Sequence, residues 1–218
     1  MSEFATLEFE DPGAGGRLGD EVRAALAREV RGWRRATPGA VLLRVYGDAW
    51  HHAPDVASAR LDRDRVDAGY QSLVKDLFGL AYPVVVALDG QVSGFGLALA
   101  LAADVRLATA RTTLSVGDLK AAALLGGTGW LVGRTCGTGT FAQLAWTGET
   151  LSADEAARRG LLGPGDAEAA RALAQRLAAD PAGSSALKRA LSTRQRSELE
   201  TVLDYEAWLA DVAAGGAG

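Results

Sequence analysis

The chain has 218 residues, a formal net charge of −4 and 48% hydrophobic residues, values typical of one globular domain or one domain with an appendage. Its pI near 5.3 gives no support for nucleic-acid binding, and no apolar run is long enough to span a bilayer. The single cysteine, Cys136, excludes an internal disulfide and most cysteine-based metal sites. The N-terminus has no signal-peptide pattern, so we expect a cytoplasmic protein without membrane or nucleic-acid partners and without a metal site.

The N-terminal part predicts a strand, a helix and a second strand. Residues 4–10 alternate between apolar and polar side chains, which is typical of an edge strand. Apolar residues recur at helical spacing over residues 19–35, so an amphipathic helix is expected there. Residues 40–46 read as a buried strand that follows the turn at Pro38.

The loop expected at residues 47–55 contains both histidines of the chain, His51 and His52, next to each other. Adjacent side chains of an extended backbone point in opposite directions, so the two rings cannot face one site together. A metal site is a poor interpretation because no third ligand is near in the sequence. The histidines are therefore either ordinary loop residues or, for one of them, a general acid–base catalyst.

The chain is organised around residues 83–107. The β-branched run Val84–Val86 predicts a strand buried on both faces, followed by a turn at Asp89-Gly90. A second loop, Ser93-Gly94-Phe95-Gly96, then leads into an apolar helix that ends near Asp104. The start of a helix offers backbone N–H groups and the positive end of the helix dipole, so it can hold an oxygen that carries negative charge.

A glycine pair before a helix is not specific by itself, because a tight strand-to-helix turn needs the same residues. The dinucleotide-binding pattern is excluded because its third glycine is missing. A P-loop is excluded because no Lys-Ser or Lys-Thr pair follows the glycines.

The rest of the chain reads as short strands and helices. A second glycine-rich turn includes Gly126 and Gly127, and Ser152 with Glu155 forms a capping box at the start of a helix that Gly160 ends. We expect the tail from residue 213 to be disordered. The other expected elements are a helical stripe at 70–78, strands at 105–108 and 112–116, and helices at 138–146, 167–179, 184–191 and 197–212.

Two of these segments resemble signatures of the crotonase (enoyl-CoA hydratase/isomerase) superfamily. The first is residues 82–104, with the motif Ser93-Gly94-Phe95-Gly96, and the second is residues 145–161, with Thr147-Gly148, Glu155-Ala156 and Gly160-Leu161. The resemblance covers roughly residues 4–212. It implies an α/β fold, a crotonase-like spiral of ββα units with two roughly perpendicular sheets over residues 1–165. A C-terminal helical oligomerisation region at 166–218 would then form homo-oligomers, usually trimers or hexamers.

The chemistry that the resemblance implies is stabilisation of a thioester enolate by two backbone N–H groups. Phe95, the middle residue of the glycine motif, would give one N–H group, and Asp118 matches the position of a catalytic carboxylate. His51 or His52 would be a further acid–base group. The residues that would bind substrate are Gly94, Ala53, Trp50, Gly126 and Gly127.

Three positions depart from the pattern of the family. The second N–H group falls at Pro54, which has none, so Ala53 or Asp55 replaces it or half of the oxyanion hole is lost. Ala98 stands where hydratases have a glutamate, and Asp118 is one methylene shorter than the other glutamate. Asp118 can serve equally as the N-cap of a short helix or as a proton shuttle.

The resemblance implies an acyl thioester as substrate and no separate cofactor. Arg44 is a candidate for contacting coenzyme A, but Asp48 stands where a lysine is common. Because the sequence stops near residue 218, we expect the usual final helix of the family to be absent. A carrier-protein thioester or an untethered substrate therefore stays open. We expect isomerisation, decarboxylation or cyclisation rather than hydration. The alternatives are a non-catalytic or auxiliary homologue, or a biosynthetic tailoring enzyme on a non-thioester substrate with His51 or His52 as acid–base catalyst.

Overall fold

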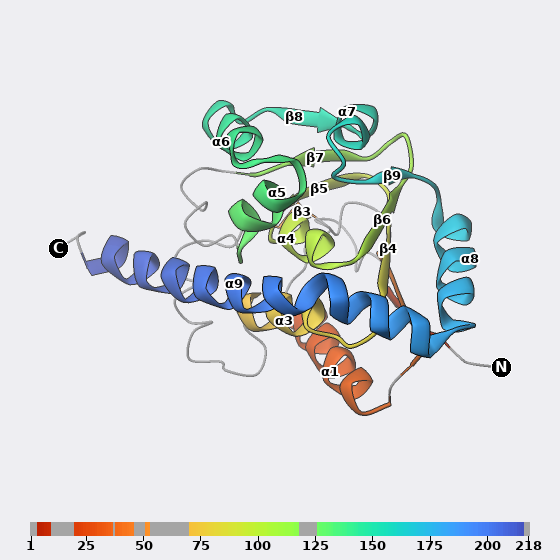
Figure 1. Ribbon diagram of the computed structural model, residues 1–218. Coiled ribbons are helices and arrows are strands. Elements are labelled where there is room, and N and C mark those ends of the chain that lie inside the picture. The colour runs from red at the N-terminus through yellow and green to blue at the C-terminus, as the bar shows by residue number, and fades with distance from the viewer. Residues whose placement is uncertain are drawn as a thin grey trace.

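The computed structural model describes residues 4–9, 20–36, 38–45, 51–52, 70–117 and 126–215. Within these residues, two sheets lie between layers of helices, and one very long helix runs across the molecule (Figure 1). No helix in this part of the chain combines the length and the apolar character that crossing a bilayer requires.

The larger sheet has five parallel strands, and β1 stands at its edge as the alternating pattern predicted. Its central strand β4 is buried at every position, in agreement with the β-branched run that predicted it. The strand order is β1 (Ala5–Phe9), β2 (Val41–Val45), β4 (Val84–Leu88), β6 (Val105–Ala108) and β9 (Gly163–Pro164).

The smaller sheet has four strands, and only the pair β7–β8 is antiparallel. Its order is β3 (His51–His52), β5 (Gln91–Gly94), β7 (Thr113–Ser115) and β8 (Thr150–Ser152). From β2 to β7, consecutive strands alternate between the sheets: β2, β4 and β6 belong to the large sheet, while β3, β5 and β7 belong to the small one. Over this part of the chain, each turn adds one strand to each sheet before the next described helix, which matches the spiral that the resemblance implies.

Helices cover both faces of the large sheet. One face, with Val41, Leu43, Val84 and Val86, packs into the main core that includes residues of α1, α3 and α4. The opposite face packs against α8 in a smaller cluster. The helices are α1 (Asp20–Ala36), α3 (Tyr70–Phe78), α4 (Phe95–Ala102), α5 (Thr128–Cys136), α6 (Thr138–Thr147), α7 (Ala153–Arg158), α8 (Ala167–Ala178) and α9 (Pro181–Gly215).

Helix α4 is the central helix of the fold, and all of its residues are buried. It therefore has no polar face, which explains why its sequence is apolar all round instead of amphipathic. The capping box predicted at Ser152 is confirmed, because its hydroxyl accepts from the Glu155 N–H while the Glu155 carboxylate accepts from the Ser152 N–H.

Three sequence expectations are wrong in detail. The loop predicted at Ser93–Gly96 is absent, because β5 ends at Gly94 and α4 begins at Phe95. The histidines form the short strand β3 instead of lying in a loop. A helix at Thr128–Cys136 was not predicted, because Gly129 and Gly133 lower its helix propensity.

The two C-terminal helices expected at 184–191 and 197–212 are one continuous helix, α9. Ser192 and Thr193 lie at the expected break, but each hydroxyl donates a hydrogen bond to the carbonyl four residues earlier, at 2.8 and 2.6 Å. These bonds keep both side chains within the helix, so they do not interrupt it. Helix α9 also takes up part of the tail that was expected to be disordered, as far as Gly215.

Candidate active site

The turn between β5 and α4 forms the centre of the candidate site. Gly94, the last residue of β5 and the N-cap of α4, has φ 56° and ψ −128°. A residue with a Cβ atom avoids this conformation, so glycine is needed to pass directly from the strand into the helix. Phe95 is consequently the first residue of α4, at the positive end of the helix dipole.

The side chain of Phe95 is an anchor for this turn. It is 1% exposed, and its ring meets the ring of Tyr70 on α3 edge to face, with centroids 4.4 Å apart. The guanidinium of the buried Arg23 on α1 lies 4.1 Å from the Tyr70 ring centroid. Three helices therefore fix the position of Phe95, and a bulky residue between the glycines supports the turn from inside the core.

Two further glycines bring distant segments against this turn. A Cβ atom placed on Gly117 would lie 3.5 Å from both N and Cα of Gly94. A Cβ atom on Gly126 would lie 3.8 Å from the Phe95 ring and 3.8 Å from the Cβ atom of Ala98. The end of β7 and the second glycine turn thus meet the start of α4 at van der Waals distance.

The short strand β3 completes the convergence. Its residues pair in parallel with β5, His51 with Ser93 and His52 with Gly94. The backbone that leads to Ala53 therefore runs beside Gly94. The structure brings together the predicted positions Gly94, Phe95, Gly126 and the backbone of both histidines, although they come from separate parts of the sequence.

Six of the residues singled out in the sequence lie outside the described residues: Asp48, Trp50, Ala53, Pro54, Asp55 and Asp118. Their predicted roles stay predictions. Gly117, which directly precedes Asp118, does lie against Gly94. The backbone therefore enters the Asp118 segment at the candidate site.

Ala98, where the resemblance led us to look for a glutamate, is fully buried on α4. Its methyl group lies beside the Gly126 position and packs within the main core. The described part of the site therefore has no carboxylate on α4.

A carboxyl that the sequence reasoning missed reaches the glycine turn from α9. Glu206 Oε2 accepts a hydrogen bond from the Gly127 N–H at 2.8 Å. Burial raises the pKa of this carboxyl to about 7, against the opposing effect of the Gly127 hydrogen bond. A signal was present in the sequence: Glu206 follows Leu199 and Leu203, which are buried, at helical spacing.

Arg44, the candidate contact for coenzyme A, lies on β2 and forms an ion pair with Glu8 at 3.6 Å. Glu8 also pairs with Arg171 on α8 at 3.2 Å. Arg44 therefore belongs to the charged margin beside α8, on the same face of β2 as Leu42, and not to the face that packs against α4.

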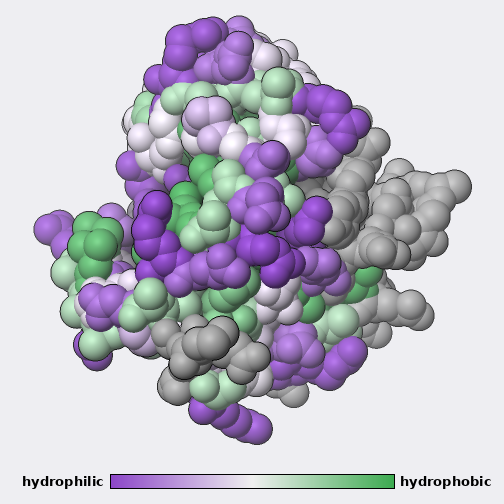
Figure 2. Space-filling model, turned by 90° about the vertical axis from the view of Figure 1, so that its right-hand side faces the viewer, coloured by the Kyte–Doolittle hydropathy of each residue, from purple (hydrophilic) through white to green (hydrophobic). Residues whose placement is uncertain are grey.

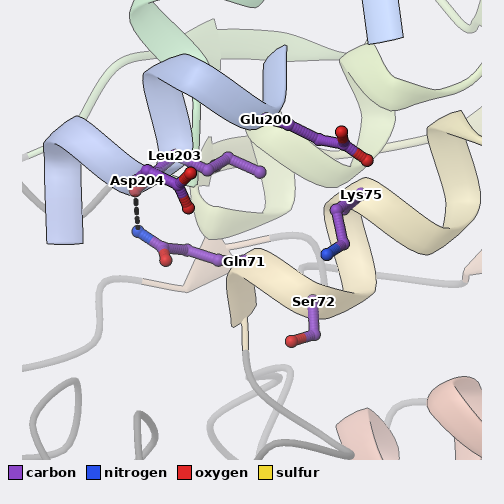
Figure 3. A pocket seen from close by; sticks show the side chains of 6 residues that line it. All are labelled: Gln71, Ser72, Lys75, Glu200, Leu203 and Asp204. Atoms are coloured by element: carbon purple, nitrogen blue, oxygen red, sulfur yellow. Dashed lines mark hydrogen bonds between the residues drawn. The ribbon is translucent and has the colours of Figure 1, made fainter. Parts of the chain in front are cut away.

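A groove lies between α3 and α9 (Figure 3), with a volume of about 340 Å³. It is lined by Gln71, Ser72, Lys75, Glu200, Leu203 and Asp204. Charges of both signs surround it, and it lacks the apolar wall that an acyl chain would need. In the described part of the chain, no group of three or more histidine, cysteine, aspartate or glutamate residues is arranged to hold a metal ion.

A family comparison decides what this arrangement is. The sequence model of the enoyl-CoA hydratase/isomerase family matches residues 55–212. The chain belongs to the enoyl-CoA hydratase/isomerase family. Family membership confirms the resemblance seen in the sequence, and it supports an enzyme of this family.

Relatives of both reaction types are found. The chain is 29% identical to the 1,2-epoxyphenylacetyl-CoA isomerase of Escherichia coli K12, over 92% of this chain and 83% of the relative. It is 32% identical to the mitochondrial methylglutaconyl-CoA hydratase of Mus musculus, over 42% of this chain and 30% of the relative.

Solved structures confirm the fold of this enoyl-CoA hydratase/isomerase family member. The crystal structure of enoyl-CoA hydratase from Bacillus halodurans superimposes with a TM-score of 0.74 at 19% identity, covering 94% of this chain and 89% of that chain. At this identity the likeness shows the crotonase-like fold, and the reaction has to be argued from the site.

Proposed function

We propose that the protein acts on an acyl thioester and stabilises its enolate oxygen at the start of α4. The N–H group of Phe95 would donate to the thioester oxygen as negative charge develops there. One well-aimed donor of this kind contributes about 3 kcal/mol to the stability of a transition state. The proposal rests on the direct passage from β5 to α4 at Gly94, with Gly117 and Gly126 packed against it.

The proposed proton carrier is Asp118. It follows Gly117, whose backbone lies against Gly94. A carboxylate close to the enolate can take a proton from one carbon of the substrate and return it to another. This exchange needs no second acid, since the same carboxyl first receives and then donates the proton.

Ala98 favours a reaction of this type over hydration. Adding water across a double bond requires one group to activate the water and another to handle the second proton. The methyl group of Ala98 can do neither, and it is fully buried. We therefore infer isomerisation, or a decarboxylation or cyclisation that passes through the same enolate.

We infer that the acyl group of the substrate is carried by coenzyme A or by a carrier-protein arm. The names of the relatives support a coenzyme A ester, because both relatives described above act on one. Arg44 is a weaker candidate contact than the sequence suggested, since Glu8 already neutralises it.

One alternative has a specific observation in its favour. A buried Ala98, together with Pro54 at the second donor position, is what a non-catalytic homologue would have. A tailoring enzyme that uses His51 or His52 on a non-thioester substrate would share the convergence of β3 with β5. Both alternatives predict no turnover of acyl thioesters.

Binding is tested first, with a thermal-shift screen of coenzyme A, acyl-CoAs of different chain length and acyl-pantetheines. A ligand that binds the native state at one hundred times its Kd stabilises that state by about 2.7 kcal/mol, which raises the melting temperature measurably. Shifts from acyl thioesters that exceed the shift from free coenzyme A support the proposal. No shift from any thioester would contradict it.

Turnover is tested with Asp118→Asn beside the matched variant Asp154→Asn, which changes an exposed aspartate on α7. We expect Asp118→Asn to lower the rate of proton exchange at the carbon next to the thioester by at least 100-fold, while acyl-CoA still binds. Asp154→Asn should leave the rate unchanged. Equal rates in both variants would rule out the proton-carrying role of Asp118.

A further inference from the structure

Glu206 on α9 uses its carboxyl for a contact inside the protein. Figure 2 shows the more usual place of polar groups, on the face that contains α8, where hydrophilic side chains lie in contact with solvent. The Glu206 carboxyl instead accepts from the Gly127 N–H at 2.8 Å, and burial raises its pKa to about 7. Removing a carboxyl from water is unfavourable, and groups perturbed in this way are concentrated at functional sites.

The turn that Glu206 contacts has little conformational preference of its own. Gly126 and Gly127 are consecutive glycines with φ of 56° and 78°. Glycine reaches many backbone conformations that other residues avoid, so a pair of glycines does not select one conformation by itself. Gly127 is also the N-cap of α5, and a glycine has no side chain with which to cap that helix. Glu206, which is 79 residues away in the sequence, brings a carboxyl to this helix start, where the helix dipole favours negative charge.

Helix α9 also packs against the turn with apolar side chains. A Cβ atom on Gly127 would lie 2.7 Å from Leu199 Cδ1 and 3.4 Å from Leu203 Cδ2, and both leucines are buried. A Cβ atom on Gly126 would lie 3.8 Å from the ring of Phe95. The turn therefore lies between α9 and the start of α4, and its position depends on both helices.

The same turn borders both groups of the proposed reaction. Its contact with the Phe95 ring supports the residue whose N–H is the proposed donor. It also ends the segment that begins at Gly117 and carries Asp118, and both ends of this segment contact the start of α4. A displacement of about 1 Å in a catalytic group can lower a rate roughly 100-fold. A contact that fixes the turn can therefore control the rate without touching the substrate.

We propose that Glu206 is a positioning residue for the candidate active site. Its carboxyl holds Gly126 and Gly127 in one conformation, and these glycines support Phe95 and fix one end of the segment that carries Asp118. Glu206 acts through the turn and does not itself contact the substrate. The inference rests on the proposed function, because it concerns the same donor and the same proton carrier.

The first test needs no substrate, so it can fail or succeed independently of the proposed function. The Phe95 amide signal, assigned with ¹⁵N-phenylalanine labelling and Phe95→Leu, is compared in ligand-free wild type and three variants. Glu206→Leu removes the acceptor of the Gly127 N–H, and Glu206→Gln keeps one at the same distance. Gln71→Ala is the matched control, because it removes a hydrogen bond between α3 and α9 that does not involve the turn.

We expect the Phe95 signal to move or broaden in Glu206→Leu and to stay at its wild-type position in Glu206→Gln and Gln71→Ala. An unmoved signal in Glu206→Leu would overturn the proposal, and so would an equal movement in Gln71→Ala. Urea denaturation checks that each variant is folded. If Glu206→Leu does not fold, Glu206→Asp takes its place, because its carboxylate is one methylene shorter and withdraws from the Gly127 N–H.

The second test separates kcat from KM in the same variants, with an acyl-CoA that the wild type turns over. Glu206→Leu should lower kcat at least about tenfold and change KM less than about twofold, because misplaced groups slow the chemistry while the substrate still binds. Glu206→Gln and Gln71→Ala should keep kcat within about twofold of wild type. An unchanged kcat in Glu206→Leu would overturn the inference. A wild type without turnover would instead contradict the proposed function, and the Phe95 signal would then decide the role of Glu206.

Discussion

Two of the polar contacts that attach helix α9 to the body of the protein differ in their chemistry. Near its start, Lys188 donates to Asp104 Oδ2 at 2.6 Å, and the same oxygen accepts from the Val84 N–H at 2.7 Å. Nearer its end, Glu206 accepts a single hydrogen bond from the Gly127 N–H. The first contact joins two opposite charges, whereas the second joins one carboxyl to a neutral amide.

The difference between the two contacts shows which of them can respond to pH. The Lys188 side chain is 2% exposed and pairs with Asp104, which also accepts from the first residue of β4, so this contact fixes α9 against the start of that strand. Burial raises the pKa of Glu206 to about 7, against the opposing effect of the Gly127 hydrogen bond, so its charge changes near neutral pH. The contact between Glu206 and Gly127 also holds the glycine turn beside Phe95. Through this contact, α9 reaches the candidate site.

The largest effect should come from breaking the ion pair. Asp104→Ala leaves the Lys188 ammonium buried without its partner and removes the acceptor of the Val84 N–H, so the free energy of unfolding should fall by about 3–5 kcal/mol. Urea denaturation measures the change. Adding Lys188→Met to Asp104→Ala should restore part of the loss, and a double variant as unstable as the single one would show that charge burial is not the cause.

The contact between Glu206 and Gly127 should be detectable in the pH dependence of the free energy of unfolding. The Glu206 carboxyl keeps its proton up to about pH 7 in the folded protein, whereas 4.5 is its ordinary pKa. Between pH 4.5 and 7 the folded state therefore binds more protons than the unfolded state. The resulting contribution to the free energy of unfolding is complete below pH 4.5 and is lost as the pH rises to 7. The loss amounts to at most about 3 kcal/mol.

Glu206→Gln keeps an acceptor for the Gly127 N–H but does not titrate. Urea denaturation from pH 4.5 to 8 should therefore show wild-type stability falling relative to the variant. Glu168→Gln, which changes an exposed carboxylate on α8, should follow the wild-type curve. Parallel curves for wild type and Glu206→Gln would contradict the raised pKa.

Gly127→Ala should lower the free energy of unfolding by less than Asp104→Ala does. Its φ of 78° disfavours a side chain, and the new Cβ atom would lie 2.7 Å from Leu199 Cδ1 on α9. Gly148→Ala has a similar φ of 68° and no atom within 4 Å, so it measures the backbone term alone at about 1 kcal/mol. Gly127→Ala should lose about 1–2 kcal/mol more than Gly148→Ala, and equal losses would mean that α9 yields freely at this point.

Gln71→Ala should have the smallest effect. Gln71 Nε2 donates to the Leu203 carbonyl at 3.2 Å across the groove between α3 and α9 (Figure 3). The bond is partly exposed to water, so its removal should cost about 0.5–1 kcal/mol in urea denaturation. A loss as large as that of Asp104→Ala would mean that α9 is held mainly by α3.

The sequence predicted the core of the fold because its central segment is locally unambiguous. A β-branched strand, glycines and an apolar helix follow one another in residues 84–102, and no other structure suits them equally well. Helix α9 was divided in the prediction near Ser192 and Thr193, whose side chains can compete with a helix for hydrogen bonds to the backbone. Their bonds to carbonyls within the helix become visible only in the structure.

The site was predictable only in part, since its contacts join distant segments. The glycines at 94 and 126 mark backbone turns, and these were recognised. The approach of Gly117 to Gly94 and of Glu206 to Gly127 depends on how the sheets and α9 pack, which local patterns do not contain. Asp118 and Pro54 remain predictions from the resemblance.

The most direct test of the account follows the Phe95 amide itself. Selective ¹⁵N-phenylalanine labelling gives five signals, one for each phenylalanine of the chain, and Phe95→Leu identifies the one of interest. On titration with a saturated acyl-CoA, the account predicts a large downfield shift of the Phe95 proton and small shifts of the other four, because the thioester oxygen accepts from that N–H. Saturation of the protein with the acyl-CoA and an unmoved Phe95 signal would contradict it.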